Sequence, residues 1–299
     1  MDSLAALPEE GARRRPRRVE ALPDRTLVMG VLNVTEDSFS DGGRHATPQE
    51  AVRHGLEMSR AGADIVDVGG ESTRPDAVPV DPAAEAARVI PVVERLAAAG
   101  VVVSVDTKNA STARAAVKAG ALIINDVSGV EMTDEMARVV AETGVHYVLM
   151  HSRGPVRSQD PKAAYDDAPS EVLAELEGPL ARLEAAGVAR EKIILDPGLG
   201  FSKRPADNWA LLRAIPRFEA LGLPVLIGAS RKRFLGSLLA AHGEDRPVDG
   251  RDAATVALTA ALAQRRVWAV RVHDVAGNAD AVAVAEALRD EPARAGAGR

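Results

Sequence analysis

The 299-residue sequence predicts an α/β protein folded as a single (β/α)8 TIM barrel. Short runs rich in Val, Ile and Leu recur eight times along the chain. Segments with helical spacing of apolar residues separate the runs, and no change in composition marks a second domain. Eight βα units in about 270 residues match this barrel more closely than the alternative, a doubly wound sheet with an extra lobe.

The eight apolar runs are short and mostly unbroken, which is typical of parallel strands buried on both faces. We expect strands at 27–32, 64–68, 101–105, 121–124, 146–150, 192–195, 224–227 and 269–272.

The segments between the runs carry signals for the start and end of helices. Thr47-Pro48 supplies an N-cap and a first-turn proline, and Gly62 follows the end of the same helix. Asp81-Pro82 begins the next helix, which ends at Gly100. Further helices are expected at 109–119, 133–143, 170–186, 207–221 and 252–264, and a long irregular loop at 152–169.

Composition excludes several classes of protein. The chain has 37 Lys and Arg against 43 Asp and Glu, and the net charge of −6 disfavours a general nucleic-acid binder. With no cysteine, disulfides and thiolate metal sites are excluded. No apolar run reaches the ~18 residues of a membrane span, and the N-terminus lacks the order of a signal peptide. We therefore expect a cytoplasmic protein without membrane or nucleic-acid partners.

The sequence also predicts how the chain is divided into a leader, a barrel and a tail. Residues 1–20, which include the basic run at 13–18, are expected to form a disordered leader. The barrel is expected to occupy 21–290, and 291–299 to be a disordered tail.

Polar residues lie at the end of every predicted strand, within its last residues or just beyond it. In a TIM barrel all the strand ends meet at one mouth, where active sites lie. Turn and cap preferences would explain any one of these residues, but a full ring that includes Lys232, Arg271 and His273 favours a binding site. The ring consists of Asn33, Asp67 with Gly69-Gly70-Glu71, Asp106, Asn125-Asp126, His151, Asp196, Ser230-Arg231-Lys232, and Arg271 with His273-Asp274.

The residue types of the ring indicate two kinds of recognition. Asp106, Asn125 and Asp196 suit the donor and acceptor edge of a polar heterocycle, because an analogue without matching groups would leave them unpaired. The basic groups of the ring suit an anion such as phosphate. The sequence has no P-loop, Rossmann fingerprint, HExxH zinc motif or nucleophile elbow.

The scarce aromatic residues give a further indication. Three of the four phenylalanines, Phe39, Phe201 and Phe234, come just after predicted strands, which suggests a planar apolar part of the substrate. For Phe234, packing of a helix after Lys232 is the favoured interpretation.

The motifs around these residues resemble those of the dihydropteroate synthase family. NVTEDSFSDGG at 33–43 and DVGGESTRP at 67–75 are similar to its two signature loops. The family's remaining motifs follow in order: SVDT at 104–107, INDVSG at 124–129, MH at 150–151, DPGLGF at 196–201, SRK at 230–232 and RVHD at 271–274. The resemblance implies a TIM barrel, usually a homodimer. Its reaction joins 4-aminobenzoate to 6-hydroxymethyl-7,8-dihydropterin diphosphate, with release of pyrophosphate.

The resemblance also implies a role for each matching residue. Asp106, Asn125, Asp196 and Lys232 would bind the pterin. Asn33, Thr73, Arg74, Arg271 and His273 would hold the diphosphate, with Mg²⁺ near Asn33. Phe39, Pro75, Phe201 and Lys232 would enclose 4-aminobenzoate, while the first two loops close as lids.

The implied chemistry is electrostatic. Mg²⁺, Arg271 and His273 would neutralise the departing pyrophosphate, and Asp106 would stabilise a cationic pterin. No protein nucleophile is required. Asp76 stands where the family often has Gly, so a non-catalytic pterin-binding paralogue is one alternative. A pterin-binding methyltransferase barrel that acts with a corrinoid protein is the other, although it would not need the basic groups.

Overall fold

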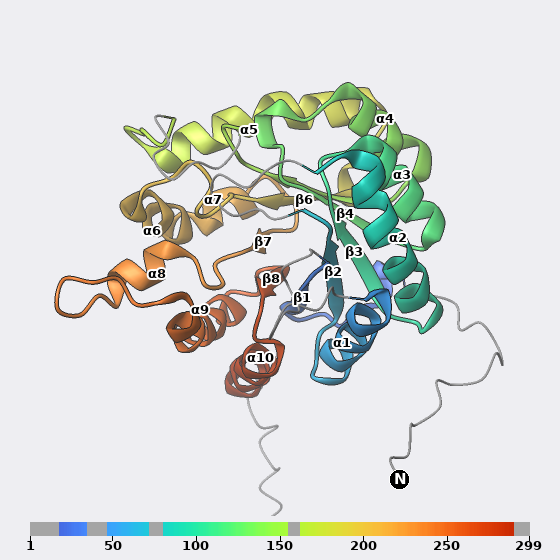
Figure 1. The fold of residues 1–299 in the computed structure, drawn as a ribbon. Helices are drawn as coiled ribbons and strands as arrows, with labels where there is room; N and C mark the ends of the chain where they lie inside the picture. Colours follow the sequence, from blue (N-terminus) through green and yellow to red (C-terminus); the bar gives the residue numbers. More distant parts are fainter. Residues whose placement is uncertain (1–17, 35–46, 72–79, 155–161, 290–299) are drawn as a thin grey trace, which may run out of the picture.

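The computed structural model describes residues 18–34, 47–71, 80–154 and 162–289, in which strands and helices alternate around a barrel (Figure 1). The eight strands are all parallel, in the order β6-β5-β4-β3-β2-β1-β8-β7. An isolated bridge between Leu195 and Val225 links β6 to the start of β7, so the barrel is nearly closed. The strands are β1 (Leu27–Asn33), β2 (Ile65–Gly69), β3 (Val102–Asp106), β4 (Ile123–Asp126), β5 (His146–Met150), β6 (Ile193–Asp196), β7 (Leu226–Ile227) and β8 (Ala269–Val272). The predicted fold class is confirmed.

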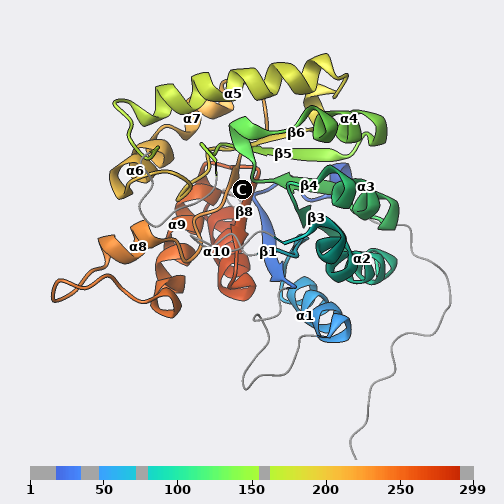
Figure 2. The same ribbon diagram turned by 45° about the horizontal axis from the view of Figure 1, so that its top comes forward.

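Helices surround the strands, as Figure 2 shows from a second direction. They are α1 (Pro48–Arg60), α2 (Pro82–Ala98), α3 (Ala110–Ala119), α4 (Asp134–Thr143), α5 (Ala168–Ala185), α6 (Pro205–Arg213), α7 (Ile215–Glu219), α8 (Arg233–Leu238), α9 (Asp252–Gln264) and α10 (Val275–Arg289). Short 3-10 turns lie at η1 (Val19–Ala21), η2 (Gly129–Glu131), η3 (Arg190–Lys192) and η4 (Val248–Arg251). None of the helices described is long and apolar enough to cross a bilayer.

The helix signals in the sequence act as expected, with one exception. Thr47 and Glu50 form a capping box at α1, and Asp81 accepts two backbone N–H bonds at the start of α2. The single helix predicted at 207–221 is wrong, because α6 and α7 are separate helices that meet at Ala214. Pro216 follows this break, and a proline cannot donate the backbone hydrogen bond that a continuous helix needs there.

The interior of the barrel is built in layers, because alternate residues of each strand point inward. The lower layer is apolar, and we call it the floor cluster: Leu27, Met29, Ile65, Val102, Ile123, Val148, Ile194, Leu226 and Ala269. A second, larger apolar core fills the space between the strands and the helices. The strands are thus buried on both faces, as their unbroken apolar runs predict.

The segment before β1 covers the lower end of the barrel. Val19 and Leu22 pack against the floor cluster, and Glu20 accepts a hydrogen bond from Lys192 at 2.6 Å. Val19 and Glu20, expected in the leader, therefore contact the barrel. Residues 1–17 of the predicted leader, the tail from 291 onward and part of the loop at 152–169 lie outside the described residues.

Candidate active site

Four charged or amide side chains from different strands meet inside the barrel above the floor cluster. Arg271 on β8 donates from Nε to Asp67 Oδ2 at 2.6 Å and from Nη2 to Asp106 Oδ2 at 2.8 Å. Asn125 on β4 donates from Nδ2 to the same Asp67 oxygen at 3.0 Å. Together with Asp196 and Lys232 they form what we call the mouth cluster: Asp67, Asp106, Asn125, Asp196, Lys232 and Arg271.

Burial controls the acid–base properties of this cluster. Burial raises the pKa of the Asp106 carboxyl to about 7, with the Arg271 charge acting in the opposite direction and Asp67 adding to the rise. Burial also raises the pKa of Asp196, against the pull of Lys232 and of a 2.7 Å hydrogen bond from the Gly198 N–H. Two acids with raised pKa values beside two cations are typical of a functional site.

Lys232 lies between the acids of the mouth cluster, Asp106 and Asp196, and the aromatic ring of Phe201. Its Nζ donates to the Leu199 carbonyl and lies 4.6 Å from the centroid of the Phe201 ring, a cation–π distance. Burial lowers the pKa of Lys232 to about 8, while Asp196 acts to raise it. Gly200 makes this approach possible, because its φ is +78° and a Cβ there would lie 2.9 Å from Lys232 Cδ.

His273 differs from the expectation of a cation. The Ser230 hydroxyl lies 2.9 Å from His273 Nδ1 and accepts the His273 backbone N–H at 3.2 Å. Burial lowers the pKa of His273 to about 4, and the charge of Arg271 lowers it further. The imidazole is therefore neutral at pH 7 and can act as a hydrogen-bond donor, while Arg271 and Lys232 carry the positive charge.

Asn33 lies at the end of β1, next to the mouth cluster. A Cβ placed on Gly69 would lie 3.7 Å from Asn33 Oδ1 and 3.9 Å from Asp106 Oδ2, so both oxygens border the space that this glycine leaves open. The other residues expected to hold the diphosphate, Thr73 and Arg74, and two expected near 4-aminobenzoate, Phe39 and Pro75, lie outside the described residues.

Two members of the predicted ring or aromatic set lie elsewhere. Phe234 is buried on α8 and meets Trp209 edge-on at 5.1 Å, so it packs a helix as favoured from the sequence. His151 bonds through Nε2 to Glu175 on α5 and through Nδ1 to Lys203, each at 2.9 Å. It therefore points away from the barrel interior.

The contacts of His151 support the loop that carries Phe201. Lys203 also donates to the Phe201 carbonyl at 2.9 Å, and Arg153 binds Glu175 and lies 3.8 Å over the Tyr165 ring. Burial lowers the pKa of His151 to about 3 and that of Lys203 to about 7. Through these contacts, His151 and Lys203 fix the position of the loop that carries Phe201.

Sequence reasoning noted Asp67 after its strand but gave it no role. It is fully buried and joins two residues of the predicted site. The available signal was an acidic residue at an inward position of a strand that otherwise reads as apolar.

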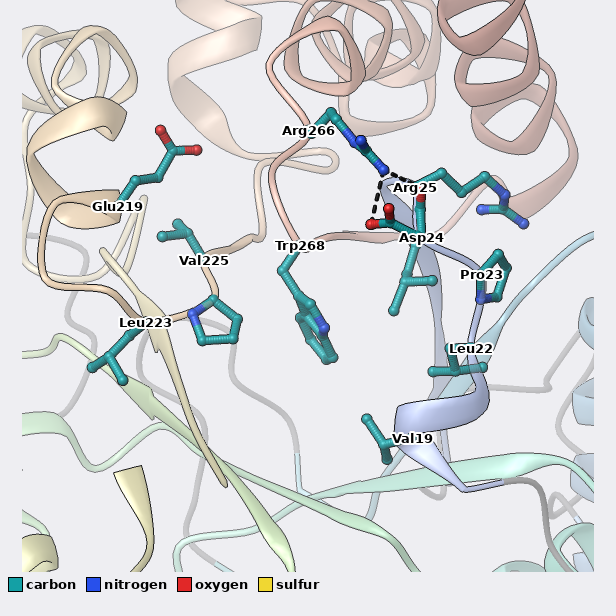
Figure 3. Close-up of a pocket in the computed structure, with 12 residues that line it drawn as sticks. Val19, Leu22, Pro23, Asp24, Arg25, Glu219, Leu223, Val225, Arg266 and Trp268 are labelled. Atoms are coloured by element: carbon teal, nitrogen blue, oxygen red, sulfur yellow. Dashed lines mark hydrogen bonds and ion pairs between the residues drawn. The ribbon is translucent and has the colours of Figure 1, made fainter. Parts of the chain in front are cut away.

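A cavity of about 430 Å³ lies at the other end of the barrel (Figure 3). Its walls come from the segment before β1 and from residues that precede β7 and β8, among them Trp268. Arg266 pairs with Asp24 there at 2.8 Å, and Arg25 pairs with Asp64. Its two arginines are thus already neutralised, whereas the mouth cluster lies at the strand ends where barrel enzymes carry out chemistry.

Comparison with known proteins defines the class first. The family model described as "Pterin binding enzyme" matches residues 29–273, which include both the floor and the mouth clusters apart from Leu27. The chain is therefore a pterin-binding enzyme of the barrel class.

The individual relatives then show which family of pterin-binding enzymes the chain resembles. A dihydropteroate synthase of Mycobacterium leprae is 53% identical over 260 residues, which cover 86% of this chain and 91% of that protein. A dihydropteroate synthase structure from Xanthomonas albilineans with 4-aminobenzoic acid has a TM-score of 0.82 at 44% identity, covering 90% of this chain and 95% of the other. A structure of that organism's enzyme with 7,8-dihydropteroate has a TM-score of 0.79 at 43% identity, with the same coverage. The chain belongs to the dihydropteroate synthase family. It is a transferase, and the methyltransferase and paralogue alternatives give way to this assignment.

Proposed function

We propose that the mouth cluster carries out the dihydropteroate synthase reaction, with the residue roles that the family resemblance implies. In this reaction the amine of 4-aminobenzoate displaces pyrophosphate from 6-hydroxymethyl-7,8-dihydropterin diphosphate and gives 7,8-dihydropteroate. The observation that carries the proposal is the meeting of Asp106, Asn125, Asp196, Lys232 and Arg271, from five points of the chain, at one buried end of the barrel.

The acids and the amide would bind the pterin ring. Asp106, Asn125 and Asp196 are at most 7% exposed, so a ring that failed to satisfy them would leave buried polar groups without partners. Because unpaired buried groups weaken binding, the pocket favours a ring that has N–H donors opposite these oxygens. The Asp106 carboxylate, when ionised, would also stabilise positive charge on the pterin as pyrophosphate departs.

Arg271 and His273 would hold the diphosphate. Asp67 and Asp106 fix the guanidinium through Nε and Nη2, and Nη1 makes no hydrogen bond to any residue in the described ranges. This side of the guanidinium is left for an anion. His273 would add a neutral donor, and Thr73 and Arg74 would join from the loop after β2.

The residues present could hold Mg²⁺ if oxygens of the substrate diphosphate supply part of its ligands. Mg²⁺ commonly takes one or two protein oxygens, several waters and substrate phosphate. Asn33 Oδ1 supplies such an oxygen beside the open space at Gly69. Among the described residues no three His, Asp or Glu side chains form a cage. When bound, the ion would supply positive charge to the leaving group.

The 4-aminobenzoate would lie on the Phe201 side of Lys232. The Phe201 ring and the Lys232 ammonium are already in contact, which suits an aromatic ring with an anionic carboxylate. Phe39 and Pro75 would close over it from the first two loops. Closure would orient the amine toward the pterin carbon and exclude water, so no covalent protein intermediate is needed.

We further propose a cytoplasmic homodimer that pairs through α9 and α10. The sequence of α9, DAATVALTAALAQ, is apolar or small on most faces. On α10, Val284 and Leu288 are 58% and 76% exposed and lie four residues apart, on one face of the helix. Analytical ultracentrifugation of the protein and of Leu288→Glu should show a dimer for the former and a shift toward monomer for the latter.

Pyrophosphate release tests the proposed reaction. Purified protein given Mg²⁺, pterin diphosphate and 4-aminobenzoate should release pyrophosphate and form dihydropteroate in equal amounts. Omission of 4-aminobenzoate should abolish dihydropteroate formation. Folded protein that forms no dihydropteroate with all components present would contradict the proposal.

A further inference from the structure

Among the described residues, Asp67 makes polar contacts only with members of the mouth cluster. It is 0% exposed on β2, and its Oδ2 accepts from Arg271 Nε at 2.6 Å and from Asn125 Nδ2 at 3.0 Å. Its other oxygen, Oδ1, is buried and accepts no hydrogen bond from the part of the chain that the structure describes. A buried carboxylate is costly unless it is paired. Its only polar contacts in the described structure hold two residues of the site.

The contact with Asn125 determines how that amide is oriented. The oxygen and nitrogen of an amide side chain are assigned from the hydrogen bonds that they make. Because Asp67 Oδ2 offers an acceptor, the Asn125 NH₂ group must face it. Asn125 Oδ1 accepts no hydrogen bond from any described residue and is the side left for a ligand.

We infer that Asp67 is a positioning residue that sets the donor and acceptor pattern of the pterin pocket. By holding the NH₂ group of Asn125, it presents Oδ1 as an acceptor and so selects a ring with an N–H donor at that point. Through the same oxygen it fixes the guanidinium of Arg271. This inference rests on the proposed assignment of Asn125 to the pterin.

Replacement of Asp67 by alanine should remove this control. The Asn125 NH₂ group then loses its acceptor, and the amide can turn and offer NH₂ in place of Oδ1 to the ligand. Asp67→Ala should therefore bind 6-hydroxymethyl-7,8-dihydropterin at least about tenfold more weakly, as measured by titration calorimetry. Asp67→Asn is the conservative variant: an amide oxygen at the position of Oδ2 accepts from both Arg271 and Asn125, so its affinity should stay within about threefold of the parent protein.

A second substitution, at the other end of the contact, separates positioning from a general structural role. In Asn125→Asp, two carboxylates face each other, and the affinity should again fall at least about tenfold. The recovery of affinity in Asp67→Asn, which restores only the acceptor, is the result that a merely structural role of the side-chain charge would not give.

Ser104→Ala is the matched control. Ser104 on β3 is paired in register with Asp67 on β2 and is fully buried, and its hydroxyl has no hydrogen-bond partner among the residues described. Its removal should leave pterin affinity unchanged. Thermal unfolding of each variant shows which of them are folded.

The outcomes are distinguishable. Parent-like affinity of Asp67→Ala, or a loss in Asp67→Asn as large as the loss in Asp67→Ala, would overturn the inference. Parent-like affinity of Asn125→Asp would also overturn it, and this result does not depend on the folding of Asp67→Ala. If Asn125→Ala itself costs no affinity, the proposed pterin role of Asn125 fails and the inference fails with it. A loss in Asn125→Ala without one in Asp67→Ala overturns the inference about Asp67 and leaves the pterin role of Asn125 standing.

Discussion

The floor cluster and the mouth cluster are successive layers of the same strands. On four strands, an apolar residue of the floor cluster is followed two positions later by a residue of the mouth cluster. These pairs are Ile65 and Asp67, Ile123 and Asn125, Ile194 and Asp196, and Ala269 and Arg271. Two residues of strand span roughly 6.6 Å. On these four strands, the residues that stabilise the fold and those of the candidate site are thus two positions apart.

The two layers make opposite energetic contributions. Burial of the floor side chains stabilises the barrel by about 1.5–3 kcal/mol for each large residue. Burial of the mouth carboxylates opposes folding unless cations compensate, and Arg271 compensates two of them. We therefore expect substitutions in the mouth to affect activity most, with stability changing only where a charge loses its partner.

Arg271→Ala should have the largest effect of the mouth substitutions, because it removes the cation shared by Asp67 and Asp106. We expect a loss of about 3–5 kcal/mol in unfolding free energy. Calorimetry should show the affinity for pterin diphosphate falling about 100-fold or more, and that for the pterin without diphosphate less than tenfold. Equal losses for the two ligands would contradict the diphosphate role of Arg271.

Asp106→Asn keeps the shape of the side chain and removes its charge. Arg271 remains paired with Asp67, so the unfolding free energy should change by less than about 1.5 kcal/mol. The kcat should fall about 10²–10³-fold, because the carboxylate no longer stabilises the cationic pterin. Unchanged turnover in a steady-state assay would refute this role.

Ile65→Ala tests the opposite layer on the strand that carries Asp67. Ile65 is fully buried in the floor cluster, so the substitution should cost about 2–5 kcal/mol of unfolding free energy in denaturant titrations. The kcat and KM should remain within about threefold of the parent at a temperature where the variant is folded. A selective loss of pterin affinity would show that the two layers are not separate.

His151→Gln probes the support behind the mouth and has the smallest expected effect. Burial lowers the pKa of His151 to about 3 in the folded protein, whereas an unfolded histidine takes up its proton near pH 6.5. Between these values the unfolded state binds more protons, so stability falls as the pH drops, by about 1.4 kcal/mol for each pH unit.

The Gln variant lacks this proton. From pH 6.5 to pH 5 it should lose about 2 kcal/mol less of its unfolding free energy than the parent does, as measured by urea denaturation. Identical pH dependence of the two proteins would contradict a buried neutral His151.

Local sequence signals predicted the strands, most helices and the strand-end ring, because the periodicity of buried residues and the cap residues act over a few positions. They could not predict that Arg271 meets Asp67, a contact between residues 204 positions apart. The neutral state of His273 depends on its burial beside Arg271, and the outward direction of His151 depends on Glu175. Such features depend on the packing of distant segments.

The location of the pterin ring tests the separation of the two layers most directly. A crystal structure with bound pterin diphosphate should show the ring hydrogen-bonded to Asp106, Asn125 and Asp196, with the diphosphate at Arg271. A ring bound in the cavity beside Trp268, at the floor of the barrel, would contradict the account.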